Sequence, residues 1–350
     1  MANYLPAPDL DHILNHTRDV WENLRGERIF ITGGTGFFGR WLLESFVWAN
    51  QKLSLGAKAL ILSRNPQAFI QKAPNLALDP SIMFLQGNVV DFNFPDEKFP
   101  FIIHAATEAN AKLNDENPLI MLDTIVDGTR HVLDFSQECG ARRFLLTSSG
   151  AVYGPQPPDL SHVPETFLGS PDPLDMRSAY GQGKRIAEHL CALYSKPGIF
   201  EPSIARCFAF VGPYLPPDQH FAIGNFISDG LNGGPIIIRG DGTPYRSYLY
   251  AADLAIWLWT ILFKGQSCRP YNVGSDFDLP IMELANVVKK NFNSGTAIQL
   301  KSKPKIGQLP LRYVPLIDRC RSELELDVWI SLEKAIANTV LWYRRFFPNE

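Results

Sequence analysis

Short apolar runs recur along the first two thirds of the chain, and stretches with helical spacing separate most of them. The run R-I-F-I-T is representative, because its apolar residues do not alternate with polar ones and glycines follow it at once. Runs of this kind are typical of strands buried on both faces, as in a parallel sheet. The strands predicted in this way are 28–32, 59–63, 82–87, 101–106, 143–149 and 203–208.

Helical patterns lie between these runs. Residues 9–25 predict an amphipathic helix before the first strand, and W-L-L-E-S-F-V-W predicts the start of another after it. Two further helices are predicted at 118–138 and 178–195. Because strands and helices alternate, the pattern predicts an α/β fold with a doubly wound parallel sheet of the Rossmann type.

The texture changes after about residue 209. Proline and glycine become frequent, as in G-P-Y-L-P-P and G-D-G-T-P, and the alternation of strands and helices weakens. We therefore expect an N-terminal helical extension at 1–26, a main domain at 27–208 and a smaller lobe over most of 209–350. The segment 246–263 is expected to return to the main domain as a buried helix, since its apolar part is too short to span a bilayer.

Composition narrows the possible partners. The 350 residues carry a formal net charge of -3 and a pI of about 6.2, without the clustered Lys and Arg that nucleic acid requires. The histidines lack metal-ligand spacing, and the five widely separated cysteines include no C-x-x-C pair. We expect no metal site and no disulfide framework. With no signal peptide visible, a cytoplasmic protein without a membrane partner is the prediction.

The glycines of G-G-T-G-F-F-G are the first candidate site. They follow a predicted strand and open a predicted helix, which is the context of a dinucleotide-binding loop. Gly33 would permit the tight turn, Gly36 would let the backbone approach a pyrophosphate, and Gly39 would allow close helix packing. The helix N-terminus would supply N–H groups and the positive end of its dipole to the phosphates.

The end of the second predicted strand bears on the choice of cofactor. Ser63 and Arg64 stand where an acidic residue would select a free ribose 2′-hydroxyl. A hydroxyl and a guanidinium suit a 2′-phosphate, so NADP is slightly favoured over NAD. Arg64 could instead be a solvated loop residue or stack on the adenine.

Tyr180 and Lys184 form a second candidate site in Y-G-Q-G-K. Four residues apart, they share one face of a helix. A nearby ammonium, together with a positive nicotinamide ring, would lower the pKa of a phenol and make it a usable base. Lys184 could also bond the nicotinamide ribose. Coupled to the glycine loop and to Ser149 at a strand end, the pair predicts hydride-transfer chemistry.

These motifs together resemble the extended short-chain dehydrogenases/reductases, within the NAD-dependent epimerase/dehydratase family that acts on nucleotide sugars. The resemblance runs from Arg28 to about Tyr343, and it is carried by S-S-G-A-V-Y-G, H-A-A-T, A-R-C-F-A-F-V-G-P and G-D-G-T-P-Y-R-S-Y-L-Y-A-A-D-L as well as by the two candidate sites. It implies an NAD(P)-binding Rossmann domain, a C-terminal substrate-binding lobe, and a homodimer built as a four-helix bundle from helices 118–138 and 178–195.

The resemblance also implies residue roles. Ser149, Tyr180 and Lys184 would be catalytic, with Tyr180 as the general base. The cofactor would lie against residues of five segments: Gly33, Gly36, Phe37, Phe38, Gly39, Ser63, Arg64, Asn88, Val89, Ala105, Ala106, Thr107, Tyr180 and Lys184. The nucleotide-diphosphate sugar would contact Glu108, Ser149, Asn225, Arg246 and, as the weaker candidate, Arg312. The asparagine that the family often carries is replaced by Ala209, so one sugar-phosphate contact is in doubt.

Gly150 and Ala151 narrow the reaction. In the family resemblance, dehydratases place Asp and Glu at these positions, and uronate decarboxylases place Glu at the second. Both acids are missing here. A 4-epimerase is therefore the first prediction, followed by a reductase of 4-keto sugars. A 4,6-dehydratase returns if Glu108 or Asn110 reaches the sugar, and a non-catalytic scaffold or redox sensor stays open. His104 is expected to be a satisfied core histidine.

Overall fold

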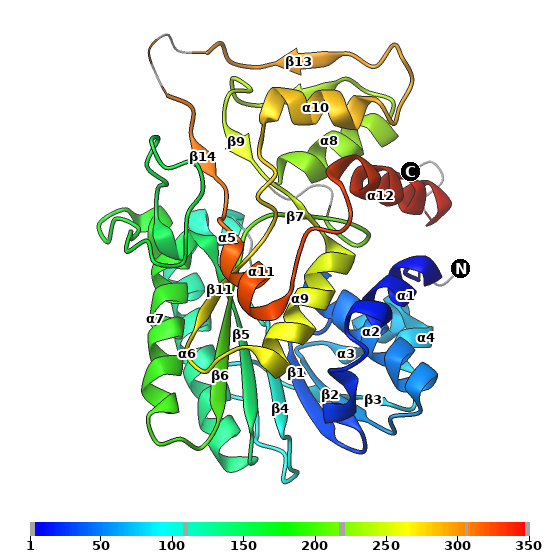
Figure 1. Cartoon of the computed structure of the whole chain (residues 1–350), viewed down its shortest axis with the longest axis vertical. Coiled ribbons are helices and arrows are strands. Elements are labelled where there is room, and N and C mark those ends of the chain that lie inside the picture. Colours follow the sequence, from blue (N-terminus) through cyan, green and yellow to red (C-terminus); the bar gives the residue numbers. More distant parts are fainter. Residues whose placement is uncertain (1–3, 108–110, 217–220, 305–306, 308, 347–350) are drawn as a thin grey trace.

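A seven-stranded parallel sheet forms the centre of the computed structural model (Figure 1), which describes residues 4–107, 111–216, 221–304, 307 and 309–346. The strand order is β11-β6-β5-β4-β1-β2-β3, so the winding direction reverses between β1 and β4. This is the doubly wound Rossmann arrangement, and the predicted fold class is confirmed. The strands are β1 (Arg28–Thr32), β2 (Lys58–Ser63), β3 (Ile82–Gln86), β4 (Phe101–His104), β5 (Arg143–Ser149), β6 (Glu201–Cys207) and β11 (Pro270–Val273).

The edge strand β11 was not predicted. It pairs with β6 in parallel, but it is short and begins with Pro270, which a sheet tolerates at an edge or a strand start. It also carries Asn272, a polar residue that is fully buried. The Asn272 amide donates to the carbonyls of Val163 and Leu316 at 2.8 and 3.0 Å. Because Asn272 bonds to distant loops, this short strand lacks the continuous apolar run by which the other strands were predicted.

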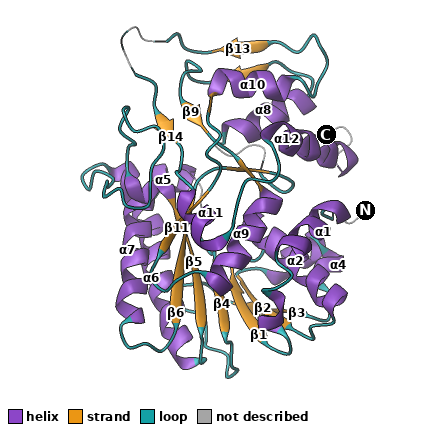
Figure 2. Cartoon of the chain, in the orientation of Figure 1, coloured by secondary structure: helices purple, strands orange, loops and turns teal. Residues whose placement is uncertain are grey.

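Helices cover both faces of the sheet (Figure 2). On one face lie α6 (Pro118–Glu138) and α7 (Ala179–Ser195), which pack against each other. On the other face α9 (Ala251–Lys264) packs against α1 (Ala7–His16) and α2 (Phe37–Leu53). The strand β1 shows why both faces are dry: Ile29 and Ile31 join the core on the α2 and α9 side, and Phe30 joins the core on the α6 side. Shorter helical segments are α3 (Pro66–Lys72), α4 (Pro74–Ala77), α5 (Ala111–Glu116), η1 (Trp21–Leu24), η2 (Gly150–Tyr153) and η3 (Met176–Ser178).

The helix predicted over 9–25 is wrong in its extent, because α1 ends at His16 and η1 is a separate turn. The Thr17 hydroxyl donates to the Ile13 carbonyl at 2.6 Å and accepts from the Trp21 indole N–H at 2.8 Å. The break turns the chain so that Trp21 becomes fully buried. Periodicity alone does not distinguish one helix from two segments that bury the same side.

The chain returns to the main sheet after entering the smaller lobe, since α9 and β11 both belong to the sheet layers. The other elements after residue 209 are β7 (Phe210–Val211), α8 (Ala222–Leu231), β8 (Ile236–Ile238), β9 (Tyr245–Arg246), β10 (Leu249–Tyr250), β12 (Leu279–Pro280), α10 (Ile281–Lys289), β13 (Ile298–Leu300), β14 (Arg312–Tyr313), α11 (Asp318–Leu324) and α12 (Leu332–Phe346). The boundary at 209 stays a prediction.

Asp253 connects both ends of the chain to α9. Its carboxylate is fully buried. One oxygen lies 2.9 Å from the His12 ring nitrogen on α1. The other accepts from the backbone N–H groups of Trp329 and Ile330 at 3.1 and 3.0 Å. A buried carboxylate is stable only with such partners.

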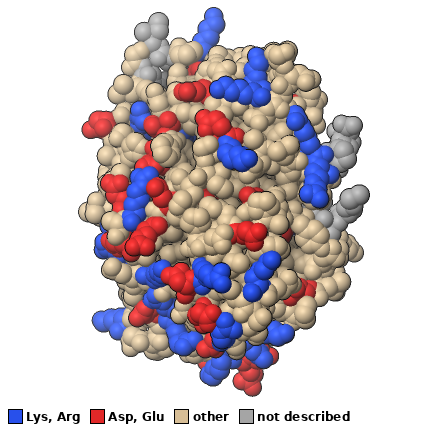
Figure 3. All heavy atoms as spheres, turned by 45° about the vertical axis from the view of Figure 1, so that its right-hand side comes forward, with Lys and Arg blue, Asp and Glu red and all other residues tan. Residues whose placement is uncertain are grey.

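On the face drawn in Figure 3, Lys and Arg side chains lie among Asp and Glu side chains, so this face shows no large patch of a single sign of charge. Among the described residues, no helix combines the length and the apolar character that a membrane crossing needs.

Candidate active site

The glycines of the first loop have different tasks. Gly33 has φ +73°, and a Cβ there would lie 2.4 Å from the Ala105 carbonyl oxygen. A Cβ on Gly39 would lie 2.3 Å from the Gly33 oxygen, so α2 packs directly onto the turn. Gly36 is different: it caps α2, and a Cβ would approach only the Gly33 oxygen, at 3.5 Å. Gly33 and Gly39 build the turn, and Gly36 leaves the helix N-terminus open for a phosphate group.

The other predicted cofactor residues lie at the carboxyl ends of neighbouring strands. Ser63 ends β2 and is buried, and Arg64 after it is exposed. After β3, Asn88 is exposed, whereas Val89 is buried beside Gly128. Phe37 and Phe38 form the first turn of α2, and Ala105 and Ala106 follow β4. Because carboxyl ends of parallel strands meet at one edge, the residues predicted to bind the cofactor lie along the same edge of the sheet.

His104 is a core residue, as expected. Its Nδ1 lies 2.8 Å from the Thr32 hydroxyl, and its Nε2 lies 3.1 Å from the Thr129 hydroxyl. Burial lowers the pKa of His104 to about 3, so the ring is neutral. The Thr32 hydroxyl also accepts from the Ala106 N–H at 3.1 Å. The chain of three side chains therefore fixes the turn that carries Ala105 and Ala106.

The structure brings Ser149, Tyr180 and Lys184 together. Ser149 ends β5, and the other two lie on the first turns of α7. The Lys184 ammonium donates to the Thr107 hydroxyl and to the Thr147 carbonyl, both at 2.7 Å. It lies 5.9 Å from the centre of the Tyr180 ring. Burial lowers the pKa of Lys184 to about 8.

The Tyr180 phenol is neutral in the protein alone. Burial raises its pKa to about 12, and interaction with the Ser149 side chain acts in the opposite direction. The sequence led us to expect a pKa lowered by the lysine, but the cost of burying a phenolate outweighs any such effect. A positively charged nicotinamide beside the ring would favour the phenolate.

A fourth side chain, Tyr313, lies at this site, and sequence analysis missed it. A Cβ on Gly150 would lie 2.7 Å from the Tyr313 hydroxyl oxygen and 2.8 Å from the Phe208 ring. The two aromatic rings thus fill the space that a side chain at position 150 would need. The Ser149 oxygen accepts from the Ala151 N–H at 3.1 Å, which directs η2 away from the strand. The one sequence signal for Tyr313 was Gly150 itself, because another side chain must fill the space that a side chain at position 150 would occupy.

Arg246 lies beside Tyr313. The two residues pair in register between β9 and β14, and the guanidinium carbon is 6.0 Å from the Tyr313 ring centre. Burial lowers the pKa of Arg246. Its side chain donates to the Tyr245 carbonyl at 2.7 Å, and among the described residues no carboxylate lies within ion-pair distance of it. A half-buried cation of this kind is suited to an anionic ligand.

The remaining predicted substrate residues are placed differently. Arg312 lies over the Tyr245 ring at 4.1 Å, and its guanidinium donates to Asp278 at 2.6 Å. Since neighbouring residues of a strand point to opposite faces, Arg312 faces away from Tyr313. Asn225 is half-buried on α8. Glu108 and Asn110 lie outside the described residues.

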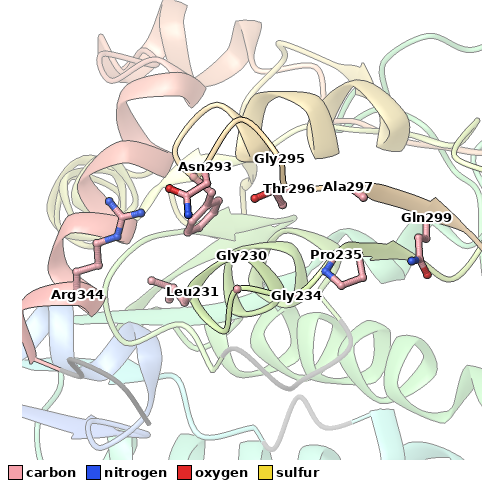
Figure 4. Close-up of a pocket in the computed structure, with 12 residues that line it drawn as sticks. Gly230, Leu231, Gly234, Pro235, Asn293, Gly295, Thr296, Ala297, Gln299 and Arg344 are labelled. Carbon is pink, nitrogen blue, oxygen red and sulfur yellow. The ribbon is translucent and has the colours of Figure 1, made fainter.

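An open hollow of about 610 Å³ lies elsewhere, in the smaller lobe (Figure 4). The C-terminal end of α8 and the loops that follow α8 and α10 line it, together with Arg344. No residue of the candidate site takes part, and Arg344 donates to the Asn291 carbonyl at 2.9 Å. The hollow is therefore separate from the Ser149 site.

Comparison with known proteins agrees with the fold. The sequence is 30% identical over 324 residues to UDP-glucuronic acid decarboxylase 1 of Arabidopsis thaliana, covering 92% of this chain and 71% of the relative. The fold is similar to that of UDP-glucose 4-epimerase from Thermotoga maritima, with a TM-score of 0.76, 20% identity, and 91% and 99% of the two chains covered. It is also similar to dTDP-glucose 4,6-dehydratase from Streptomyces venezuelae, solved with NAD bound, with a TM-score of 0.77, 24% identity, and 91% and 97% covered.

The sequence profile of the NAD dependent epimerase/dehydratase family matches residues 29–274. This segment contains the glycine loop, Ser149, Tyr180, Lys184 and Arg246, and it ends before Tyr313. A Rossmann sheet, a glycine loop at its carboxyl edge and the neighbouring tyrosine–lysine pair are all present in this chain. The protein belongs to the NAD dependent epimerase/dehydratase family of enzymes.

Proposed function

We propose that this protein is an NAD(P)-dependent nucleotide-sugar 4-epimerase, which oxidises the sugar at C4 and then returns the hydride to the other face. The observation that supports the proposal best is the corner beside Ser149. Tyr313 and Phe208 fill it, and neither Gly150 nor Ala151 carries an acid that elimination or decarboxylation would use. The relatives named above act on nucleotide sugars by their names, which supports the substrate class.

The residues would share the work as follows. Tyr180 removes the proton from the C4 hydroxyl, and Ser149 holds that oxygen while carbonyl character develops. Lys184 is fixed by Thr107 and Thr147, so its charge stays beside the Tyr180 ring. Bound NAD(P) supplies the hydride acceptor for oxidation and the hydride donor for the return. Arg246 would hold the diphosphate.

A net reductase is the second candidate, because Ser63 and Arg64 suit the 2′-phosphate of NADPH. A 4,6-dehydratase is the alternative if Glu108 or Asn110 reaches C5 or C6 of the sugar. The names of the curated relatives make UDP-glucuronic acid a necessary test substrate as well.

The test is a panel of UDP-, dTDP-, CDP- and GDP-hexoses and UDP-glucuronic acid, with products followed by NMR. We expect one pair of C4 epimers to interconvert without net change of nicotinamide. Stoichiometric NADPH oxidation would identify the reductase. A pentose product or a 4-keto-6-deoxy sugar would identify decarboxylation or dehydration. Normal cofactor binding with no turnover of any sugar would leave the scaffold or redox-sensor alternative.

For the cofactor, we propose a slight preference for NADP that rests on Arg64. The Arg64→Ala variant should lose affinity for NADP and keep its affinity for NAD, as measured by quenching of protein fluorescence. An unchanged ratio of the two dissociation constants would remove the reason for the preference.

We also propose a homodimer that pairs α6 and α7 as a four-helix bundle. The two helices pack together and leave four apolar side chains exposed: Leu119, Ile120, Ile186 and Leu193. Light scattering should give twice the chain mass, and Leu193→Glu should give monomers. A wild-type monomer at micromolar concentration contradicts the proposal.

The five cysteines are all free thiols, which supports a reducing compartment, and we propose the cytoplasm.

A further inference from the structure

Tyr313 lies against the reaction centre but has no task in the proposed mechanism. Its hydroxyl oxygen would be only 2.7 Å from a Cβ on Gly150, the residue directly after Ser149. It also interacts with the Ser149 side chain, as Tyr180 does. Ser149 therefore interacts with two phenols. The second phenol comes from β14, outside the segment that the family profile matches.

The Tyr313 ring is held in place from several directions. Its centre lies 4.7 Å from that of Phe208. The next residue, Val314, donates its N–H to the Gln156 side chain at 3.0 Å and accepts from the Val163 N–H at 2.9 Å. Leu316 donates back to the Val163 carbonyl at 2.9 Å. A hydroxyl fixed in this way needs little reorganisation when it meets a ligand.

The Tyr313 hydroxyl is a hydrogen-bond donor at neutral pH. Burial raises its pKa above the ordinary value, and the nearby Tyr180 and Cys207 act in the same direction. Arg246 and Ser149 oppose the shift without reversing it. The corner thus presents a neutral donor at the place where acid-bearing members of the family would carry a carboxylate.

We propose that Tyr313 is a further catalytic residue, whose hydroxyl donates a hydrogen bond to an oxygen of the bound sugar on the side that Gly150 faces. The proposal rests on the proposed function, because it requires a sugar at this site. It has a consequence for specificity: a neutral hydroxyl donor favours a sugar that places an oxygen acceptor at this corner.

The experiment compares Tyr313→Phe with Tyr245→Phe, a matched control. Tyr245 precedes Arg246 on β9 and stacks on Arg312, on the opposite face of the same small sheet. Titration calorimetry would measure the affinity of the cofactor-loaded enzyme for UDP and for the panel sugar with the highest turnover, or for UDP-glucose if none is turned over. Thermal melting would confirm that both variants are folded.

We expect Tyr313→Phe to weaken sugar-nucleotide binding roughly fivefold to tenfold, which is the loss of one hydrogen bond, and to lower kcat by about tenfold or more. UDP affinity should stay within about twofold, and Tyr245→Phe should match the wild type. The proposal is overturned if folded Tyr313→Phe equals Tyr245→Phe, or if UDP binding falls as much as sugar binding. If no panel sugar turns over, the proposed function fails. The difference between the binding free energies of the sugar nucleotide and of UDP, compared between Tyr313→Phe and the wild type, still tests the role of Tyr313. Equal wild-type affinity for UDP and the sugar contradicts both.

Discussion

The two walls of the candidate site are built from different parts of the chain. One wall is Ser149 at the end of β5 with Tyr180 and Lys184 on α7. The other wall is Gly150 with Phe208 and Tyr313, and Tyr313 comes from β14 near the C-terminus. In the proposed function, the first wall would transfer the proton, and the aromatic rings of the second would limit which groups fit. The family profile covers the first wall together with Gly150 and Phe208, and it ends before Tyr313.

The glycines of the two regions show the same contrast. Gly33 and Gly39 exclude a side chain because backbone atoms lie too close. Gly150 excludes one because two side chains, Tyr313 and Phe208, lie too close. A glycine of the second kind depends on the side chains around it, so smaller residues at positions 208 and 313 would leave room for a side chain at position 150.

The largest effect is expected on the first wall, from Tyr180→Phe. Without the phenol no group takes the sugar proton, and turnover should fall about a thousandfold or more. Affinity for the cofactor, measured by fluorescence quenching, should remain close to that of the wild type, because the ring is retained. Activity above a tenth of the wild-type value would show that another group is the base.

An intermediate effect is expected on the second wall, from Gly150→Ala. The new Cβ must displace the Tyr313 hydroxyl or the Phe208 ring, so the free energy of unfolding should fall by about 1–3 kcal/mol in urea denaturation. Turnover should fall with it.

Gly240→Ala is the matched control, since a Cβ there has no heavy atom within 4 Å, and its stability should be unchanged or slightly higher. If Gly150→Ala is as stable as this control, Tyr313 is not lodged against Gly150, and the two walls do not differ as described.

A third effect, similar in size to that of Gly150→Ala, concerns pH and the charge of Lys184 on the first wall. Lys184 has a folded-state pKa of about 8, below the ordinary 10.5, so the unfolded chain binds its proton more tightly. Its penalty on folding is complete below about pH 8 and vanishes above about pH 10.5. Relative to the wild type, Lys184→Met should therefore gain more stability at pH 7 than at pH 10, by roughly 1–3 kcal/mol.

The lost hydrogen bonds to Thr107 and Thr147 lower the stability of the Lys184→Met variant equally at both pH values, so the difference between the two urea titrations isolates the charge. A difference of zero, or one of opposite sign, would contradict a burial-dominated pKa at Lys184.

Most of the fold and the first wall could be predicted from the sequence. Six strands of the main sheet and the helices α6 and α7 follow from local apolar patterns, and the Ser149, Tyr180 and Lys184 set follows from short motifs. Local patterns could not predict the features that depend on side-chain contacts. The hydrogen bond between Thr17 and Trp21 accompanies the break in a continuous helical pattern. The polar Asn272 interrupts the apolar pattern of an edge strand, and Tyr313 reaches the site because it pairs with Arg246.

The Asp253 cluster sets the limits of the folding unit. Its carboxylate depends on His12 from α1 and on the N–H groups of Trp329 and Ile330, all of which lie outside the matched residues 29–274. A gene trimmed to that segment would encode a chain in which Asp253 lacks these hydrogen-bond partners, and the chain would also lack Tyr313. The segment that the family profile matches is therefore shorter than the folded unit, and a chain made for expression, refolding or fusion should extend at least from α1 to Ile330.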